Sequence, residues 1–361
     1  MMCRRPPQPT LSDDAGFTLV ELLVALMIGV IIVSAGFTVL TSSSLALRSN
    51  EQTVDMQQSV RMAMELLSRD MKMAGFGAPG VAIGNCAGAI VPNDQNPAGA
   101  DTGADSVQLL VPTTKSSGAN RWTLRSATGA NGTAQIDLQQ GGGGAVADMV
   151  VAGLTVGSYI SIGGAATVQV ASVNSGTSSI GISAIPPPLW FQAEDQVYLL
   201  QCIRYQVVPQ PDTGNLCLGG APCLTRGVAG IVVGPNAETP IAQGVEDLQL
   251  AYACDGCVAT INGGIPDQII DDQNASNSFD QPDFVSNQTW ATAPLTPDKI
   301  QLVQIALVAR QLKNDMGFGE TGKAPVGSPQ TVLTADRTLP ADQNHRRRIL
   351  MKTVETRNVG L

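Results

Sequence analysis

The sequence contains a single histidine in 361 residues, and charged residues make up only 14% of it. With one imidazole in the chain, a Ser-His-Asp triad, a histidine-rich metal site or a histidine acid–base pair has little to be built from. We therefore predict no enzyme activity, no catalytic residue, no metal and no cofactor. The histidine, His345, opens the stretch HRRR, which we interpret as a solvated turn before the last strand rather than an anion site.

An excess of basic residues is also missing. The chain has 21 Lys and Arg against 30 Asp and Glu, which gives a formal net charge of -9. A nucleic-acid-binding surface needs a basic patch, so nucleic acid is not expected as a partner. The low charge, together with 38 Gly and 22 Pro, predicts a body rich in loops and strands.

The acidic residues do not form a recognisable calcium motif. The stretch IIDDQNASNSFDQPDF carries Asp271, Asp272, Asp280 and Asp283 between polar residues. A calcium loop needs oxygen ligands at short, regular spacing, and the D-x-D-x-D-G pattern is absent here. We favour a plain polar loop over a calcium site.

One long apolar run contrasts with the rest of the chain. It extends from Phe17 to about Leu40 and is interrupted near its start by one acid, Glu21. This length matches the roughly 20 residues that a helix needs to cross the hydrocarbon core of a bilayer. Arg4 and Arg5 on the short polar flank favour a cytoplasmic N-terminus, which puts the chain after about residue 41 on the other side of the membrane.

The seven cysteines fit an oxidising compartment. Cys3 would lie on the cytoplasmic side, and an even number remains outside. Closeness in sequence favours pairing within CLGGAPC and within CDGC, which leaves Cys86 to join Cys202, although six cysteines allow 15 connectivities. A zinc site built from those four cysteines and a redox-active C-x-x-C are the less favoured alternatives. The candidate disulfide residues are Cys86, Cys202, Cys217, Cys223, Cys254 and Cys257.

Apolar residues at helical spacing continue beyond the membrane-length run. Val60, Met64, Leu67, Met71 and Ala74 recur at steps of three and four, and the glycines and proline of GFGAPG end the pattern. We therefore predict one helix over residues 17–74, with its membrane-spanning part at about 17–40. The Met-rich stripe is interpreted as core packing rather than a ligand site.

After the helix, the hydrophobic period changes to that of strands. Short segments rich in β-branched and aromatic residues are separated by Gly, Pro, Asn or Ser, without an internal repeat. We expect a β-rich domain over 75–361, with a small β insertion at about 153–184, and hence an α+β fold. The predicted strands are DSVQLLVP, GSYISIG, ATVQVASV, SSIGIS, QVYLLQCIRYQVV, VEDLQLAYAC and KIQLVQIALVARQL.

The residues around Glu21 carry a resemblance to a known family. Gly16, Phe17 and the following TLVE match the G-F-T-L-x-E signature of class III signal peptides, so the N-terminus resembles a type IV prepilin. The resemblance implies that a prepilin peptidase removes the leader, residues 1–16, and methylates the new N-terminus at Phe17. It further implies that Glu21 pairs with the N-terminal ammonium of a neighbouring subunit, which would offset two charges that are each costly in lipid.

Weaker landmarks are similar to the PilW-type minor pilins. They are LLSRDMKMAGF, GVEDLQLAYACD, IQLVQIALVARQ and RRRILMKTVETRNVGL, in that order. This resemblance implies a type IV pilin-like fold, an inner-membrane anchor with a periplasmic domain, and a place at the pilus tip. The implied partners are major and minor pilins, the prepilin peptidase, the inner-membrane assembly machinery and, through residues 17–40, lipid. A type II secretion pseudopilin and a pilus-displayed adhesive or ligand-binding protein remain alternatives.

Overall fold

The computed structural model describes residues 18–78, 82–95, 103–113, 122–129, 134–139, 145–186, 188–209, 216–228, 238–286, 288–313, 345 and 347–358. The chain falls into two units, Met1–Glu51 and Gln52–Leu361. One helix, α1 (Leu19–Met73), has residues in both units. Sequence analysis predicted a helix over 17–74, and the structure gives this helix at Leu19–Met73.

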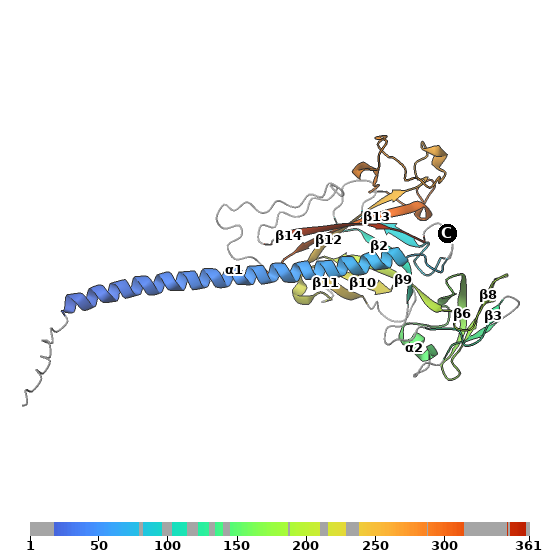
Figure 1. The fold of residues 1–361 in the computed structure, drawn as a ribbon, viewed down its shortest axis with the longest axis horizontal. Coiled ribbons are helices and arrows are strands. Elements are labelled where there is room, and N and C mark those ends of the chain that lie inside the picture. The colour runs from blue at the N-terminus through green and yellow to red at the C-terminus, as the bar shows by residue number, and fades with distance from the viewer. Residues whose placement is uncertain are drawn as a thin grey trace, which may run out of the picture. The chain divides into compact units, whose positions relative to one another are not determined.

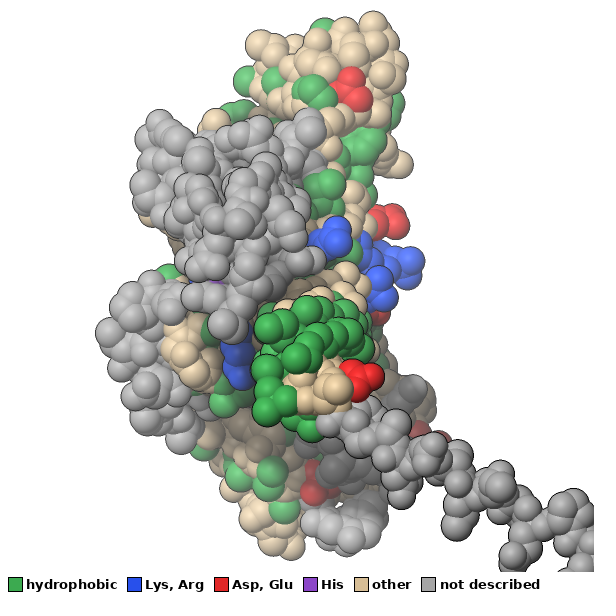
Figure 2. Space-filling view, turned by 90° about the vertical axis from the view of Figure 1, so that its left-hand side faces the viewer, with side chains coloured by type: hydrophobic (Ala, Val, Ile, Leu, Met, Phe, Trp, Pro, Cys, Tyr) green, Lys and Arg blue, Asp and Glu red, His purple; other side chains and the backbone are tan. Residues whose placement is uncertain are grey.

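In the first unit, α1 has almost no buried side chain. This helix is long and apolar enough to cross a membrane. Leucine, valine and isoleucine side chains stand exposed around its whole circumference, from Leu19 to Leu40. Figure 2 shows hydrophobic side chains gathered in one cluster facing the viewer. An all-round apolar helix needs lipid or other helices around it, because no other element covers it among the described residues of this unit, 18–51.

In the second unit, residues 52–73 of α1 bury one face against the strands (Figure 1). The buried stripe holds Met56, Val60, Ala63, Met64, Leu67 and Met71, which follow the period of three to four residues read from the sequence. The helix ends at Met73, two residues before Gly75, whose φ of +79° favours glycine. A Cβ at this position would lie 2.5 Å from the backbone oxygen of Asn358.

A three-stranded antiparallel sheet provides one surface of this core. Its order is β12 (Val245–Cys254), β13 (Ile300–Arg310) and β14 (Arg347–Glu355). Among the described strands β14 pairs only with β13, from Leu302 opposite Glu355 to Arg310 opposite Arg347. β14 is therefore an edge strand beside the helix.

A nine-stranded sheet forms the other part of the domain. Its main path is β1-β2-β9-β5-β6-β7-β4, and β10 pairs with both β9 and β11. The elements are β1 (Ile90–Asn93), β2 (Ser106–Thr113), β4 (Gln135–Asp137), β5 (Tyr159–Ile162), β6 (Ala166–Asn174), β7 (Ser179–Ile182), β9 (Val197–Val208), β10 (Cys223–Val228) and β11 (Thr239–Gln243). A separate two-stranded sheet joins β3 (Thr128–Gly129) to β8 (Trp190–Phe191), and α2 spans Ala145–Val151. The α+β prediction is confirmed.

The long strand β9 contributes residues to two large hydrophobic cores and to a small third one. Ile203 and Tyr205 pack with α1, whereas Val197 and Leu199 belong to a second core that includes residues from Trp122 onward. The insertion expected at about 153–184 lies in this second core, which also takes in α2 and β4. The short strands β3 and β4, of two and three residues, are too brief to stand out in the sequence.

A disulfide links the start of the domain to β9. Cys86 and Cys202 have Cα atoms 5.6 Å apart and are separated by 116 residues in the sequence. This is the pair left over once closeness in sequence has joined the other four cysteines. Both residues are fully buried, together with Ile83, Leu110 and Leu200, in a small third core.

A buried polar cluster fixes α1 to the nine-stranded sheet. The Tyr205 hydroxyl donates to Asp70 Oδ2 at 2.6 Å, and Arg226 Nε donates to the same oxygen at 2.9 Å. Asp70 is on the helix, Tyr205 on β9 and Arg226 on β10. Burial first, and then the negative charge of Asp70, raise the pKa of Tyr205 above its ordinary value of 10.0.

The first prediction concerns this cluster in alkali. Because the folded chain holds the Tyr205 proton more tightly than the unfolded chain, this stabilisation is complete below pH 10.0 and falls as the pH rises further. Each such tyrosine lowers the free energy of unfolding by about 1.4 kcal/mol per pH unit. Burial also raises the pKa of Tyr252, so this tyrosine adds to the same loss of stability in alkali. Tyr205→Phe should therefore remove one of these two tyrosine contributions to the pH dependence of the free energy of unfolding. Urea unfolding of the full chain in detergent, at several alkaline pH values, measures the slope; an unchanged slope would contradict this account.

The second prediction concerns the long-range disulfide. Replacing both Cys86 and Cys202 by Ser should lower the free energy of unfolding by about 4 to 5 kcal/mol, because a loop of more than 100 residues becomes free in the unfolded chain. The matched control is the Cys217→Ser, Cys223→Ser variant, whose bridge spans only six residues and should cost less. Denaturant unfolding under non-reducing conditions compares the two. A larger loss in the control would show that loop size is not the deciding term.

Candidate functional site

The predicted processing site lies outside the described residues. Both Gly16 and Phe17 precede Thr18, the first residue that the structure describes. Cleavage between them and methylation of Phe17 therefore remain predictions.

Glu21 has a partner within its own helix. Thr18, just before the helix, donates to Glu21 Oε2 from its backbone nitrogen at 3.3 Å and from its hydroxyl at 3.2 Å. The Glu21 backbone nitrogen donates in return to Thr18 Oγ1 at 3.2 Å. This reciprocal arrangement is a capping box, which satisfies amide groups that the first helical turn leaves without partners.

Because of the capping box, the Glu21 carboxylate has hydrogen-bond partners even within a single subunit. A carboxylate in the first turn interacts favourably with the helix dipole, and here it also accepts two hydrogen bonds from Thr18. The T-x-x-E spacing of Thr18 and Glu21 was visible in the sequence and was missed there. The carboxylate is exposed on an otherwise apolar surface, so it can still meet a charge from outside the chain.

The remaining cysteines form two short bridges. Cys217 is joined to Cys223 and Cys254 to Cys257, which is the pairing that closeness in sequence favoured. Cys254 and Cys257 lie within 4.8 Å of an Asp271 oxygen, in a group that includes neither Cys217 nor Cys223. The four-cysteine zinc site considered from the sequence is thus not assembled by the described residues. Disulfide sulfurs also lack the thiolate charge that zinc requires.

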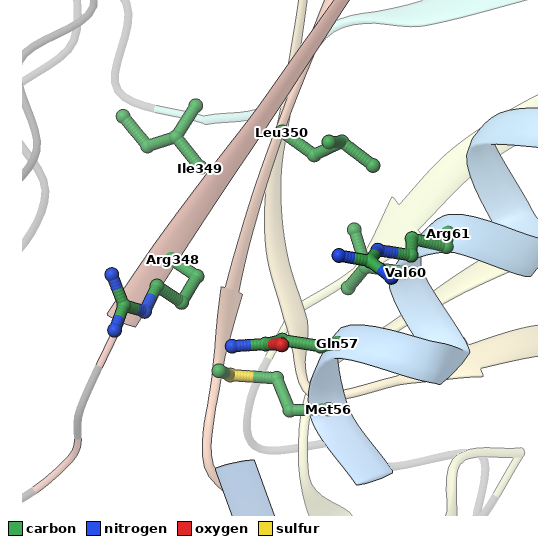
Figure 3. Close-up of a pocket in the computed structure, with 7 residues that line it drawn as sticks. All are labelled: Met56, Gln57, Val60, Arg61, Arg348, Ile349 and Leu350. Atoms are coloured by element: carbon green, nitrogen blue, oxygen red, sulfur yellow. The ribbon is translucent and has the colours of Figure 1, made fainter. Parts of the chain in front are cut away.

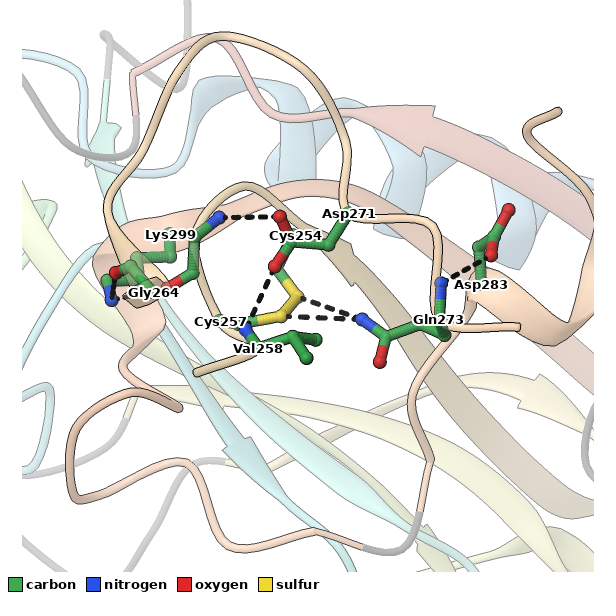
Figure 4. The surroundings of a disulfide bond; sticks show 9 residues. Cys254, Cys257, Val258, Gly264, Asp271, Gln273, Asp283 and Lys299 are labelled. Carbon is green, nitrogen blue, oxygen red and sulfur yellow. Dashed lines mark hydrogen bonds between the residues drawn. A yellow bond between two sulfur atoms is a disulfide. The ribbon is translucent and has the colours of Figure 1, made fainter. Parts of the chain in front are cut away.

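The surroundings of the Cys254–Cys257 bridge are filled by polar groups of the following loop (Figure 4). Asp271 accepts the backbone N–H groups of Gly256 and Val258 at 3.1 and 2.9 Å. The Gln273 amide nitrogen lies 3.7 Å from Cys257 Sγ. Lys299 Nζ donates to the carbonyls of Gly256 and Gly264. These bonds make Asp271 part of the support of the loop.

Asp272 and Asp283 of this loop also bind backbone amides, whereas Asp280 accepts the side-chain amide of Asn274 at 3.0 Å. Asp283 accepts from Gln273 and Asp280, at 2.8 and 2.7 Å. Asp272 accepts from Ser276 and Asn277. Its pKa is raised by desolvation but lowered more by these amides, so it lies below the ordinary value of 3.8. No three of these carboxylates, among the residues that the structure describes, converge as calcium ligands would.

His345 occupies a bend before the last strand, as expected, although it is half-buried rather than fully solvated. Its Nδ1 lies 3.4 Å from Arg310 Nη1. Nearby, the side chains of Arg310 and Arg347 both pair with Glu246 on β12. These ion pairs therefore link the start of β12 to the end of β13 and to the start of β14.

Comparisons with known proteins match both ends of the chain. Residues 208–358 match the family described as Type IV Pilus-assembly protein W, a span that contains β10 to β14. Residues 11–37 match the Prokaryotic N-terminal methylation motif.

Two known proteins are similar to parts of the chain. The Pilin-like protein PilA3 of Thermus thermophilus is 40% identical over 60 residues, which cover 17% of this chain and 26% of that protein. The chain thus spans about a quarter of the length of this curated relative. The solved Type IV-like pilin TTHA1219 from Thermus thermophilus aligns with 84% of this chain and 98% of its own, at 10% identity and a TM-score of 0.34.

The two family matches lie on different parts of the fold. The methylation motif covers Thr18 and Glu21, and the second match covers the sheet on which α1 packs in the second unit. Together, these matches support a type IV minor pilin of the PilW type.

Proposed function

We propose that this protein is a minor pilin that takes part in assembly of the type IV pilus, in a priming or tip complex. The observation that carries the proposal is the composition of α1. Its first part is an exposed apolar helix with one acid in the first turn, and its last part is buried in a β-rich domain. Such a helix serves both as a membrane anchor and as a segment that packs against other helices.

The proposed course begins in the inner membrane, with the C-terminal domain in the periplasm. Prepilin peptidase cuts between Gly16 and Phe17 and methylates Phe17. Residues 17–40 then hold the subunit in lipid until the assembly machinery and the other pilins take it up. The match of residues 11–37 to the methylation motif supports this order of events.

Glu21 has two successive partners in this proposal. In the single subunit the capping box with Thr18 offsets part of the cost of a carboxylate near lipid. In the filament the N-terminal ammonium of a neighbour provides a full opposite charge. The second partner is the stronger one, so recruitment is favoured over remaining in the membrane.

We propose a structural role rather than a catalytic one. The single histidine lies beside Arg310, and Asp271 and Asp283 of the following loop are occupied by backbone amides. The match to the pilus-assembly family over 208–358 supports a pilus over a secretion pseudopilin. Adhesion by the displayed domain and a contribution to twitching motility are compatible with the same role.

The third prediction tests processing. Gly16→Val should leave residues 1–16 attached, because the bulkier side chain stands at the position where the peptidase requires a small residue. The variant should accumulate in the membrane and be missing from purified pili. Mass spectrometry of the membrane fraction identifies the N-terminus. Finding a mature N-terminus other than N-methyl-Phe17 in the unaltered protein would refute the proposed cleavage.

The fourth prediction separates the charge of Glu21 from its capping role. Gln can occupy this position of a capping box but carries no charge. If the charge drives recruitment, Glu21→Gln and Glu21→Ala should both insert normally yet be depleted from pili by tenfold or more, which corresponds to about 1.4 kcal/mol. Immunoblots of purified pili and membranes measure the distribution.

The matched control for Glu21 is Glu51→Ala, which removes an exposed acid farther along the same helix. It should leave recruitment unchanged. Normal recruitment of Glu21→Gln, with loss only in Glu21→Ala, would mean that helix capping and not charge is what matters.

A further inference from the structure

A groove lies between the helix and the edge strand within the second unit. It has a volume of about 300 Å³ and is open to the surface. Figure 3 shows the residues that line it: Met56, Gln57, Val60 and Arg61 come from α1, and Arg348 and Leu350 come from β14. Its position beside β14 matters because this strand has no described neighbour on its outer edge.

The floor of the groove is apolar. Met56 and Val60 lie one helical turn apart and belong to the main core, and Leu350 packs against that core from the strand. Lys352, two residues after Leu350 and hence on the same face of β14, reaches Glu65 at 3.7 Å. The helix-facing side of β14 therefore continues from the groove into an ion pair with α1.

Two cations flank this apolar floor from different elements. The guanidinium groups of Arg61 and Arg348 are exposed and form no hydrogen bond or ion pair with the part of the chain that the structure describes. In contrast, Arg204, Arg226 and Arg347 each pair with a carboxylate. The groove thus presents positive charge on a protein whose net charge is -9.

We propose that this groove receives an amphipathic helical segment of another pilin-type subunit, one that carries a carboxylate beside apolar residues. The inference rests on the proposed function, since it names a contact made during assembly. A carboxylate of the segment would pair with Arg61 or Arg348, and its apolar side chains would cover Met56, Val60 and Leu350. Residues spaced three or four apart on a helix supply both kinds of contact on one face.

The geometry favours such a segment over a nucleic acid. A phosphate backbone needs a row of cations, whereas Glu65 lies next along the helix and already occupies Lys352. A nucleic acid would also leave the apolar floor uncovered. A protein segment can bury that floor with apolar side chains. It can also pair its carboxylates with the two guanidinium groups in partly dehydrated surroundings.

The fifth prediction tests the groove by cross-linking in the pilus-forming cell. A photo-reactive amino acid replaces Gln57 in the full chain, and the products are identified by mass spectrometry. We expect a cross-link to an acid-bearing helical segment of a pilin-type subunit. Adding Arg61→Glu and Arg348→Glu should reduce its yield by about tenfold, because each contact becomes a pair of like charges.

The matched control is Arg69→Glu with Arg357→Glu, which changes the net charge equally at exposed residues outside the groove. It should leave the yield unchanged. Near-ultraviolet circular dichroism checks that both double variants fold. If the groove variant does not fold, Arg61→Gln with Arg348→Gln replaces it, with a smaller loss expected.

A cross-link only to a second copy of the chain, to nucleic acid or to lipid would overturn the inference. An equal yield in the groove and control variants would do the same. Purified pili from the same cells separate the two proposals. Protein present in pili without the expected cross-link counts against the groove alone, and protein absent from pili counts against the proposed function as well.

Discussion

A carboxylate removed from water must find a partner, since an isolated buried charge costs several kcal/mol. Asp70 is the point in the second unit where this constraint is strictest. It lies on the face of α1 that packs on the strands, and it is satisfied only when Tyr205 on β9 and Arg226 on β10 stand opposite it. The hydrophobic stripe of the helix would tolerate small shifts along the sheet. The three-group cluster does not, and it therefore sets the register between helix and sheet.

The same constraint explains the shape of the loop that follows β12. Between Asp255 and Asp283, this loop packs only Cys257 and Val258 against the main core, and Ile265 and Ile269 remain exposed. The carboxylates of Asp255, Asp271 and Asp283 instead hold the loop in place, since each accepts hydrogen bonds from two backbone N–H groups. The Cys254–Cys257 bridge closes the start of the loop. These hydrogen bonds and the disulfide thus stabilise the conformation of this loop, a role that hydrophobic packing has elsewhere in the domain.

Patterns local in sequence were enough to predict much of this fold. The stripe from Val60 to Ala74 predicted the buried face of α1, and each of the seven apolar segments contains a strand. What could not be predicted joins residues far apart. Asp70 is separated from Tyr205 by 135 residues and from Arg226 by 156, and no local period marks such a contact. The sequence favoured a polar loop at these aspartates, but it could not say which amides each carboxylate binds, because those partners are fixed only by the folded path of the loop.

Glu21 differs from Asp70 in how much of its negative charge is compensated by partners within the chain. Asp70 has a hydroxyl and a guanidinium within 2.9 Å, so it needs nothing from outside the chain. Glu21 has only the weaker hydrogen bonds of Thr18, at 3.2 and 3.3 Å, and no positive charge among the described residues nearby. Hydrogen bonds to a neutral group offset less of the cost of a charge than an ion pair does. A carboxylate that is left partly compensated on an exposed apolar helix therefore gains more from a partner subunit than one already paired within the fold, and the proposed role of Glu21 in assembly rests on this difference from Asp70.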